Sequence, residues 1–326
     1  MIVVTGATGF LGGAVLRALS RRGERVLGLV RASSDARDLE RAGIATAVGD
    51  VVDGVGLGQA FAGARTVIHA AGMLGRSGAD DAEYRRVHVD GTRNVVQAAR
   101  AAGVERVVHV SSPGLLGPIP KGAPHADEDA PAAPTNPYER SKAAAEDALR
   151  DDAAKRGPLA VIVRPEFVYG PGDRHVLRLF RAIQRRRFFY FGRGDALCHP
   201  TYVDDAVAGL LAAAERGKPG RVYHVAGPHP VPIRELAETF ARALGVAAPF
   251  VHLPEAPVRL ALRFLEPLAG RAGLSLPLTS SGVDFFTFDR HFSTERARDE
   301  LGFCPSIGLA EGAERAVRWY EDEGLL

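Results

Sequence analysis

Residues 2–13 of the chain read "IVVTGATGFLGG", and this stretch decides the fold. A short apolar run suited to a buried strand ends at Gly6, two more glycines follow at Gly9 and Gly12, and a helical pattern begins there. Glycines at such a strand-to-helix turn permit a tight bend and let backbone N–H groups approach a pyrophosphate at the helix N-terminus. The spacing is one residue longer than the GxGxxG fingerprint. Its place between the first strand and the first helix nevertheless predicts a nucleotide-binding loop.

The rest of the first half repeats this order of strand and helix. Runs rich in β-branched residues predict strands at 25–30, 45–48, 66–71, 106–112 and 159–165. Helical patterns occupy 12–23, 91–103 and 141–157. Strands that are apolar throughout and alternate with helices are typical of a parallel sheet covered on both faces. The sequence therefore predicts an α/β fold with a doubly wound, parallel-sheet Rossmann domain over residues 1–164. A smaller mixed α/β substrate domain is predicted over 165–326, with part of 195–216 returning to the first domain.

The composition excludes several classes of protein. The 326 residues are 46% hydrophobic and 25% charged, with a net charge of +2 and two cysteines. This charge gives no overall attraction to nucleic acid, and two cysteines provide neither a disulfide framework nor metal-ligand spacing. The start lacks the basic residues of a signal peptide, and no run of about 18 apolar residues predicts a membrane span. We expect a cytoplasmic protein without nucleic acid or metal, and interpret the basic, aromatic stretch 185–194 as a strand with solvated arginines.

The end of the second predicted strand indicates which dinucleotide binds. An NAD-binding loop usually carries Asp or Glu there, to accept a hydrogen bond from the ribose 2′-OH. Here Val30 is followed by Arg31, whose guanidinium can pair with a 2′-phosphate. We therefore favour NADP(H), while NAD(H) stays open because Arg31 also fits the description of a surface arginine. Asp50, just after the third strand, is expected beside the adenine, and the small residues of 69–72 suit a nicotinamide-ribose channel.

The stretch "NPYERSK" (136–142) places Tyr138 four residues before Lys142. Residues four apart share one face of a helix, and a nearby ammonium group stabilises a phenolate and so lowers the phenol pKa. Such a pair can act as a general acid–base. Ser111 and Ser112 end the fifth predicted strand, where strand ends converge on the ligand crevice, and offer a hydroxyl to hold a substrate oxygen. A chance occurrence of the Tyr138–Lys142 pair is disfavoured, because the glycine loop, the serine, the tyrosine and the lysine occur together in this order.

With these motifs the sequence resembles the extended short-chain dehydrogenases/reductases, the NAD-dependent epimerase/dehydratase superfamily. Besides "TGATGFLG" and "YERSK", the resemblance rests on "HVDGTRNVVQAA" (88–99), "RPEFVYGPGD" (164–173), "PTYVDDAVAGLLAA" (200–213) and "STERARDELGFCP" (293–305). It implies that Tyr138 donates or accepts the proton and that Lys142 also holds the nicotinamide ribose. It further implies that Ser112, five residues before Gly117, is the catalytic serine. This chain has His88 where the family often has Asn.

Three departures distinguish the chain from family members that act on nucleotide sugars. Phe167 stands where those members have an Asn that contacts the substrate diphosphate, and Cys198 where they have an Arg for the same group. Pro113 and Gly114 replace the Asp-Glu pair of the sugar dehydratases. The resemblance therefore favours the branch of hydroxysteroid dehydrogenases and dihydroflavonol-type reductases. Arginines that could take over the diphosphate contacts occur at Arg174, Arg178 and Arg193.

The apolar second half suits a hydrophobic substrate. Residues 248–270 and 276–286 would supply an apolar wall for a hydrophobic alcohol or ketone. Ordinary core packing explains the same pattern, and a basic amphipathic helix at a membrane surface is a third interpretation. The family resemblance also implies a homodimer built on the helices around 90–102 and 138–155.

We therefore predict an NADP(H)-dependent oxidoreductase that interconverts a secondary alcohol and a ketone on a hydrophobic small molecule, with Ser112, Tyr138 and Lys142 as catalytic residues. A nucleotide-sugar epimerase with tightly bound NAD is the alternative, and a cofactor-sensing binding protein without catalysis is a third hypothesis. The predicted cofactor contacts are Gly6, Thr8, Gly9, Phe10, Leu11, Gly12, Arg31, Asp50, Val51, Ala70, Ala71, Gly72, Ser111, Tyr138, Lys142, Pro165, Phe167 and Val168. The predicted substrate contacts are Met73, Pro113, Gly114, Phe167 and His175.

Overall fold

The computed structural model describes residues 1–74, 81–271, 276 and 278–326, and its centre is a seven-stranded parallel sheet. The strands lie in the order β11 (Val222–Val225), β6 (Ala160–Pro165), β5 (Arg106–Val110), β4 (Thr66–His69), β1 (Ile2–Thr5), β2 (Val26–Val30) and β3 (Thr46–Val48). The strand order reverses between β1 and β4, and ligands of such sheets bind at the carboxyl ends of the strands beside that reversal. The α/β, Rossmann-type fold predicted from the sequence is confirmed.

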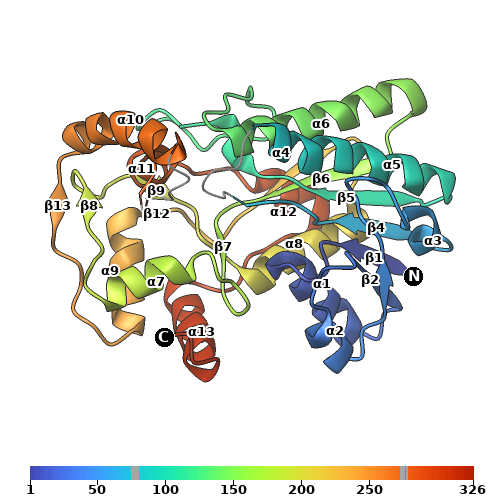
Figure 1. The fold of residues 1–326 in the computed structure, drawn as a ribbon, viewed down its shortest axis with the longest axis horizontal. Coiled ribbons are helices and arrows are strands. Elements are labelled where there is room, and N and C mark those ends of the chain that lie inside the picture. Colours follow the sequence, from blue (N-terminus) through green and yellow to red (C-terminus); the bar gives the residue numbers. More distant parts are fainter. Residues whose placement is uncertain (75–80, 272–275, 277) are drawn as a thin grey trace.

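Helices cover both faces of the sheet (Figure 1). One face carries α3 (Leu57–Phe61), α4 (Asp81–Arg85), α5 (Gly91–Ala101) and α6 (Pro137–Arg156). The other carries α1 (Phe10–Arg21), α2 (Arg37–Arg41), α8 (Val203–Arg216) and α12 (Glu295–Leu301). Every residue of β1 and β4 is buried as a result. Because both faces are covered, polar residues of these strands such as Thr5 and His69 are buried as well, and exposed and buried residues do not alternate.

The second half of the chain returns to the nucleotide-binding sheet. Helix α8 packs on the sheet face beside α1, and β11 pairs with β6, so that Val225 lies opposite Pro165. A Cβ on Gly209 of α8 would lie 2.6 Å from the Val225 side chain, which explains the glycine at this close helix–strand contact. Sequence analysis did not detect β11, because a four-residue strand bounded by glycine and proline turns gives too short a signal.

The other elements of the second half gather beyond the carboxyl ends of the strands, on the left of Figure 1. Their helices are α7 (Leu177–Gln184), α9 (Ile233–Ala243), α10 (Glu255–Arg271), α11 (Ser280–Thr287) and α13 (Leu309–Asp322). Their strands form the pairs β7 (Val168–Tyr169) with β10 (Thr201–Tyr202), β9 (Leu197–Cys198) with β12 (Val231–Pro232), and β8 (Tyr190–Phe191) with β13 (His252–Leu253). Phe180 of α7 stacks on Phe240 of α9 with ring centres 4.1 Å apart, and both rings belong to the same apolar core as Ile2 and Val4 of β1.

The long segment between β5 and α6 is attached to the C-terminal part of the chain. It begins with a 3₁₀ helix, η2 (Pro113–Leu116). The N–H of Ile119 donates to the carbonyl of Asp289 at 3.0 Å, and the N–H of Ala126 to that of His291 at 3.3 Å. The segment thereby brings residues near 290 to the ends of β5 and β6, where the site predicted from the sequence lies.

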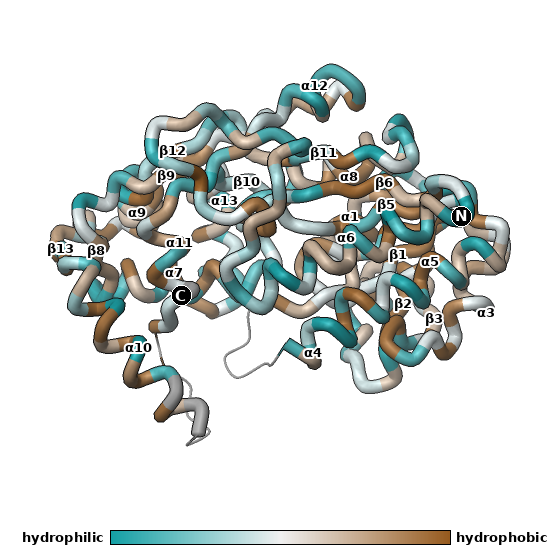
Figure 2. The backbone as a smooth tube through the Cα atoms, turned by 90° about the horizontal axis from the view of Figure 1, so that it is seen from above, coloured by the Kyte–Doolittle hydropathy of each residue, from teal (hydrophilic) through white to brown (hydrophobic). Residues whose placement is uncertain are grey.

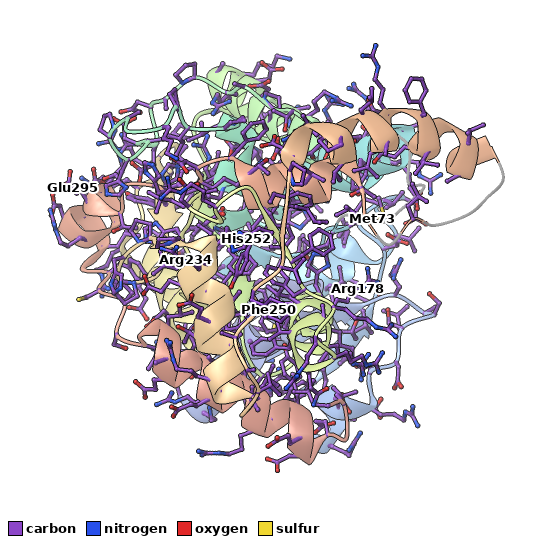
Figure 3. All side chains as sticks on the ribbon, turned by 90° about the vertical axis from the view of Figure 1, so that its left-hand side faces the viewer. Met73, Arg178, Arg234, Phe250, His252 and Glu295 are labelled. Carbon is purple, nitrogen blue, oxygen red and sulfur yellow. The ribbon has the colours of Figure 1, made fainter. Side chains whose placement is uncertain are left out.

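Helix α10 lies at the end of the molecule opposite the N-terminus, and Figure 2 shows hydrophobic residues along it. Leu260, Phe264 and Leu268, spaced four residues apart, are 58%, 64% and 60% exposed, whereas Leu262 is buried. The stripe is open to solvent, whereas Leu262 on the opposite face belongs to a buried apolar cluster with Phe191 and Val283. Phe250, in the segment that leads into β13, is also exposed (Figure 3).

Two further sequence expectations concern the second half. Within the part of the chain that the structure describes, no helix is both long and apolar enough to cross a membrane. In the second predicted wall segment, residue 277 lies outside the described residues, and the C-terminal part of the segment forms α11.

Candidate active site

The glycine loop makes a turn that admits no side chain. Gly6 has a φ of +68°, and a Cβ at this position would lie 2.7 Å from the backbone of Ala70 and Ala71, just after β4. The N–H of Gly9 donates to the carbonyl oxygen of Gly6 at 2.9 Å, and a Cβ on Gly12 would overlap the same oxygen. The loop, the first turn of α1 and the end of β4 are therefore in direct backbone contact, as close approach to a pyrophosphate requires.

The N-terminus of α1 offers unused donors to an anion. The helix begins after Gly9; within this fully described helix no side chain caps the N-terminus and no acidic residue lies in the first turn. Thr8 and Gly9 are exposed, and Phe10 and Leu11 are half-buried. A helix N-terminus of this kind, with a glycine cradle in front of it, fits the pyrophosphate of a dinucleotide.

The residues predicted to hold the adenosine end lie after β2 and β3. Arg31 directly follows β2 and is exposed. The next carboxylate along the chain, Asp35, forms a 2.5 Å ion pair with Arg37. Asp50, after β3, accepts a hydrogen bond from the N–H of Val52 at 2.9 Å, which fixes the orientation of its carboxylate. The end of β2 therefore presents a cation rather than the carboxylate that binds a ribose 2′-OH.

A chain of hydrogen bonds fixes the end of β4 beside the glycine loop. The N–H of Ala71 donates to Thr5 Oγ1 at 3.2 Å, Thr5 Oγ1 lies 2.8 Å from His69 Nδ1, and His69 Nε2 lies 3.2 Å from Thr92 Oγ1. Because the Thr92 hydroxyl itself donates to the carbonyl of His88, its oxygen accepts from His69 Nε2–H and leaves Nδ1 to accept from Thr5. Burial lowers the pKa of His69 to about 3, so the ring is neutral, as this chain of donors requires.

Helix α6 brings Tyr138 and Lys142 to the ends of β4 and β5. The side chain of Asn136 caps the helix by accepting a backbone N–H of the first turn at 3.0 Å. Lys142 is buried, and its Nζ donates to the carbonyl of Val110 at 3.0 Å and lies 5.9 Å from the centre of the Tyr138 ring. A Cβ on Gly72 would be 3.5 Å from this Nζ, so the lysine reaches the segment that follows β4.

The protonation behaviour of this pair differs from the sequence expectation. Burial raises the pKa of the Tyr138 phenol above its usual value, and a hydrogen bond with Ser112 offsets only part of this effect. Burial also lowers the pKa of Lys142 to about 8, against the opposing effect of Glu146. We expected the ammonium group to lower the phenol pKa. Desolvation of the phenolate is the dominant effect here, and the ammonium group lies 5.9 Å from the centre of the phenol ring.

The two serines after β5 have different surroundings. Ser112 Oγ accepts the N–H of Gly114 at 3.2 Å and is hydrogen-bonded to Tyr138. Ser111, which is buried, donates its hydroxyl to Glu146 Oε1 at 2.6 Å. Ser112 therefore faces the tyrosine. The hydroxyl of Ser111, which we predicted to contact the cofactor, is instead hydrogen-bonded to Glu146.

His88, which replaces the usual Asn, connects the segment after β4 to α6. It lies in a π-helical turn, η1 (Arg86–Asp90), between α4 and α5, and such turns are frequent at functional sites. Its Nε2 accepts the N–H of Met73 at 2.9 Å, and its Nδ1 donates to Ser141 Oγ at 2.7 Å, since the Ser141 hydroxyl itself donates to the carbonyl of Tyr138. The ring packs edge-on against Tyr138, with ring centres 5.7 Å apart. Burial lowers the pKa of His88 far below its usual value, so this connection is made by a neutral ring.

The segment after β6 leads from the sheet into the second half of the chain. Phe167 has a φ of +33°, a strained conformation for a residue with a side chain. Thr201 on β10 maintains it, because its N–H donates to the carbonyl of Phe167 at 3.1 Å and its hydroxyl to that of Glu166. The Phe167 ring lies 5.0 Å from that of Phe285 on α11. Cys198 is buried and its thiol donates to a backbone carbonyl at 3.4 Å, so neither position offers a donor for a diphosphate.

Three buried charged residues in this region were missed by sequence analysis. Arg290, which follows α11, forms a 2.9 Å ion pair through Nη2 with Glu139, the residue after Tyr138. Glu166 directly follows β6, and burial raises its pKa to about 7; Arg290 opposes this shift and Glu139 adds to it. The carboxylate in "RPEFVYG" was a detectable signal, since it interrupts an apolar strand end. Nothing in the sequence connects position 290 with position 139.

The other predicted contact residues differ in how deeply they are buried. Pro113, Gly114 and Pro165 are buried at the ends of β5 and β6, and Val168 is half-buried. Met73, labelled in Figure 3, is half-buried. The predicted substrate residue that the structure leaves exposed is His175. The arginines considered for a diphosphate are exposed as well, namely Arg174, Arg178 and Arg193. In the described ranges, no group of three His, Cys, Asp or Glu residues is placed to hold a metal ion.

A glycine loop at the strand ends of a Rossmann sheet, with a serine, a tyrosine and a lysine beside it, is the arrangement of a dinucleotide-dependent enzyme. The chain belongs to the NAD dependent epimerase/dehydratase family, whose model matches residues 2–226. It is therefore an oxidoreductase of the extended short-chain type, a class that acts on CH–OH groups with NAD(P).

Relatives cover nearly the whole chain. A 4-hydroxy-2-methyl-3-oxo-4-farnesyl-3,4-dihydroquinoline-1-oxide ketoreductase from Stigmatella aurantiaca is 32% identical over 324 residues, covering 95% of this chain and 94% of its own. Sterol demethylase protein B from Methylococcus capsulatus is 32% identical over 332 residues, covering 99% of both chains. Among solved structures, that of gox2253 is 29% identical, with a TM-score of 0.86 over 100% of this chain and 99% of that chain.

Proposed function

We propose that the protein is an NADP(H)-dependent oxidoreductase that interconverts a secondary alcohol and a ketone on a hydrophobic small molecule. The observation that carries this proposal is the meeting of Ser112, Tyr138 and Lys142 at the ends of β4 and β5, next to the glycine loop. A phenol between a hydroxyl and an ammonium group, beside a dinucleotide cradle, is suited to adding a proton to a carbonyl oxygen.

In ketone reduction, Ser112, Tyr138 and Lys142 would each have a separate role. When bound, NADPH supplies a hydride to the carbonyl carbon. Tyr138 stays protonated at neutral pH because burial raises its pKa, so it can give its proton to the carbonyl oxygen. Ser112 donates to the same oxygen and orients it. Lys142, with a pKa of about 8, is mostly cationic at neutral pH and stabilises the phenolate that proton transfer leaves. In alcohol oxidation Tyr138 takes the proton back.

The cofactor would be held by the elements that already fit its groups. The glycine loop and the N-terminus of α1 would bind the pyrophosphate. Arg31 would pair with the 2′-phosphate by charge-assisted hydrogen bonds, and Lys142 would bind the nicotinamide ribose. Asp50 would lie beside the adenine.

An apolar substrate is favoured by the residues after β6. Phe167 packs on Phe285, and Cys198 is buried, at the two positions where nucleotide-sugar enzymes of the family have diphosphate contacts. The names of two relatives, a ketoreductase of a farnesylated quinoline oxide and a sterol demethylase protein, also point to hydrophobic substrates. A nucleoside diphosphate would find no matching donors at these positions.

The test is the binding of NADPH and NADH to the purified wild-type protein and to Arg31→Ala. We expect NADPH to bind at least ~10-fold more tightly to wild type, a difference of ~1.4 kcal/mol, and Arg31→Ala to abolish that difference. Turnover of a panel of hydrophobic ketones with NADPH would then follow.

Two other outcomes would favour the other hypotheses. Protein that is purified with NAD bound and does not exchange it would favour a nucleotide-sugar epimerase, which oxidises and re-reduces its substrate without net use of cofactor. Protein that binds NADPH but turns over neither ketones nor sugars would favour a cofactor-sensing role. Sedimentation of the purified protein would test the homodimer expected through the helices around 90–102 and 138–155.

A further inference from the structure

We propose that Glu166 and Arg290 form a polar subsite beside the catalytic tyrosine, and that this subsite binds a second oxygen of the substrate. The substrate would then be an apolar ketone with an additional hydrogen-bond-accepting oxygen close to the reacting carbonyl, as in a β-keto ester. This inference rests on the proposed function and specifies its substrate class.

The first observation is an unused donor on Arg290. The residue is 7% exposed, and its Nη2 is bound to Glu139 at 2.9 Å. Its Nε is buried and has no hydrogen-bond partner among the described residues. Proteins pair nearly all of their buried donors, so the unpaired Nε shows that the guanidinium of Arg290 is held beside the site with donor capacity that the described residues do not use.

The second observation is the distance of Arg290 from the reacting centre. A Cβ on Gly114 would lie 3.3 Å from Ser112 Oγ and 3.1 Å from Arg290 Nη1. The hydroxyl that orients the reacting oxygen and the guanidinium are thus separated by a single residue that has no side chain. A small, bifunctional head group can contact both, whereas any side chain at position 114 would crowd the two.

The third observation is the carboxyl group of Glu166. The residue is 5% exposed, and its hydrogen bonds within the described part of the chain are made by its backbone, with Val225 at 3.0 Å and with Thr201. Arg290 and Glu139 affect the pKa of its carboxyl group, and the charge of this group in turn affects the pKa values of Tyr138 and Cys198.

These surroundings determine which substrate group the subsite prefers. Burial raises the pKa of Glu166 to about 7, so near neutral pH a large fraction of the carboxyl is protonated and can donate. With Arg290 Nη1, which would lie 3.1 Å from a Cβ on Gly114, the subsite then presents a second donor and suits an acceptor such as an ester or keto oxygen. Phe167 follows Glu166 in the chain, and its ring packs on Phe285 of α11. The apolar remainder of the substrate would pack against these two rings.

The test uses two ketones of equal length that differ in the second oxygen function, ethyl 3-oxohexanoate and 4-nonanone. The measured quantity is the ratio of their kcat/KM values with NADPH, because a ratio cancels general damage to the enzyme. We expect Glu166→Leu to lower this ratio at least ~10-fold relative to wild type. Arg290→Lys, which keeps a cation for Glu139 but removes the Nη1 donor, should lower it as well.

The pH dependence gives an independent readout. An acceptor oxygen binds better to protonated Glu166, so the wild-type ratio should fall as pH rises through about 7. Glu166→Gln retains a donor that does not titrate, and its ratio should be independent of pH. Thermal unfolding and the Kd for NADPH establish that each variant is folded.

An unchanged ratio in Glu166→Leu, or a pH-dependent ratio that persists in Glu166→Gln, would overturn the subsite. The proposed function fails in a distinguishable way: wild type would then bind NADPH but reduce neither ketone, and the subsite would fall with it.

Discussion

The cofactor side and the substrate side of the active site are built from different parts of the chain. At the glycine loop, the proposed cofactor contacts are backbone groups: Gly6 touches the backbone after β4, and the N–H groups at the start of α1 are those that would bind a pyrophosphate. On the proposed substrate side, the groups are side chains of distant segments, such as Glu166, Phe285 and Arg290.

The difference teaches where the site can change. Backbone positions are set by the sheet and its turns, so a substitution in the glycine loop must disturb the backbone to have an effect. Side chains on the substrate side can be exchanged while the sheet stays intact. Three predictions test this contrast, beginning with the residue that belongs to both sides, and a fourth concerns a buried histidine of the sheet.

Tyr138→Phe should lower kcat about 10³-fold, because general acid–base catalysis contributes roughly 10²–10⁴ and the hydroxyl is its source. The Kd for NADPH should change by less than about 2-fold, since the ring is retained. The matched control is Tyr190→Phe, which removes a buried hydroxyl that has no partner among the described residues, and kcat should stay at the wild-type value. Retention of more than about a tenth of the wild-type kcat in Tyr138→Phe would exclude it as the proton donor.

Gly6→Ala should weaken NADPH binding about 10²-fold, because the new Cβ would lie 2.7 Å from the backbone of Ala70 and Ala71. Gly23→Ala is the matched control: it has a similar φ of +74°, but nothing described lies within 4 Å of its Cβ. It should cost about 1–2 kcal/mol of unfolding free energy from the unfavourable φ alone and leave the Kd unchanged. Fluorescence titration and urea unfolding measure the two effects, and equal Kd values for the two variants would contradict the close-approach explanation.

Phe285→Ala should raise the KM for an apolar ketone about 10-fold, because the ring packed on Phe167 is lost from the substrate side. Binding of NADPH should be unaffected, in contrast to Gly6→Ala. Phe250→Ala, at a site that is 81% exposed, is the control and should leave KM at the wild-type value. Steady-state kinetics measure the KM for the ketone. A parallel loss of NADPH affinity in Phe285→Ala would show that the cofactor side and the substrate side are not independent.

His109→Leu should change the pH dependence of stability. His109 on β5 is buried, both of its ring nitrogens lack partners within the described structure, and burial lowers its pKa well below 6.5. The unfolded chain takes up a proton near pH 6.5 and the folded chain does not, so this residue removes about 1.4 kcal/mol of stability for each pH unit below 6.5. Urea unfolding at pH 7.5 and 5.5 should therefore show a smaller loss in His109→Leu than in wild type, and identical losses would mean that native His109 is protonated.

Much of the cofactor side could be predicted from the sequence because it obeys local rules. The glycine loop, the strands around it and the spacing of Tyr138 and Lys142 depend on turns and helix periodicity within a few residues. The strand β11 lacked such a signal, since four residues between turns are too few to establish a period.

The structure corrects the sequence-based interpretation of residues whose pKa, hydrogen bonds or exposure depend on how the chain packs around them. The pKa of Tyr138 is raised rather than lowered, because desolvation of a phenolate is decided by everything packed around it. Ser111 has the same residue type and strand end as Ser112, yet its hydroxyl is bound to Glu146. The apolar stripe of α10 that includes Phe264 faces outward, although its sequence resembles that of a core helix.

The sequence by itself determined most of the sheet, the glycine loop and the spacing of Tyr138 and Lys142, since each follows from short-range patterns, and the family resemblance singled out Ser112. Only the tertiary structure decided that Glu166 and Arg290 lie beside that tyrosine. Their positions are separated by more than a hundred residues, and no local propensity encodes such a contact. Arg290 comes near because the segment after α11 packs against the one that precedes α6, whereas Glu166 is placed by the end of β6.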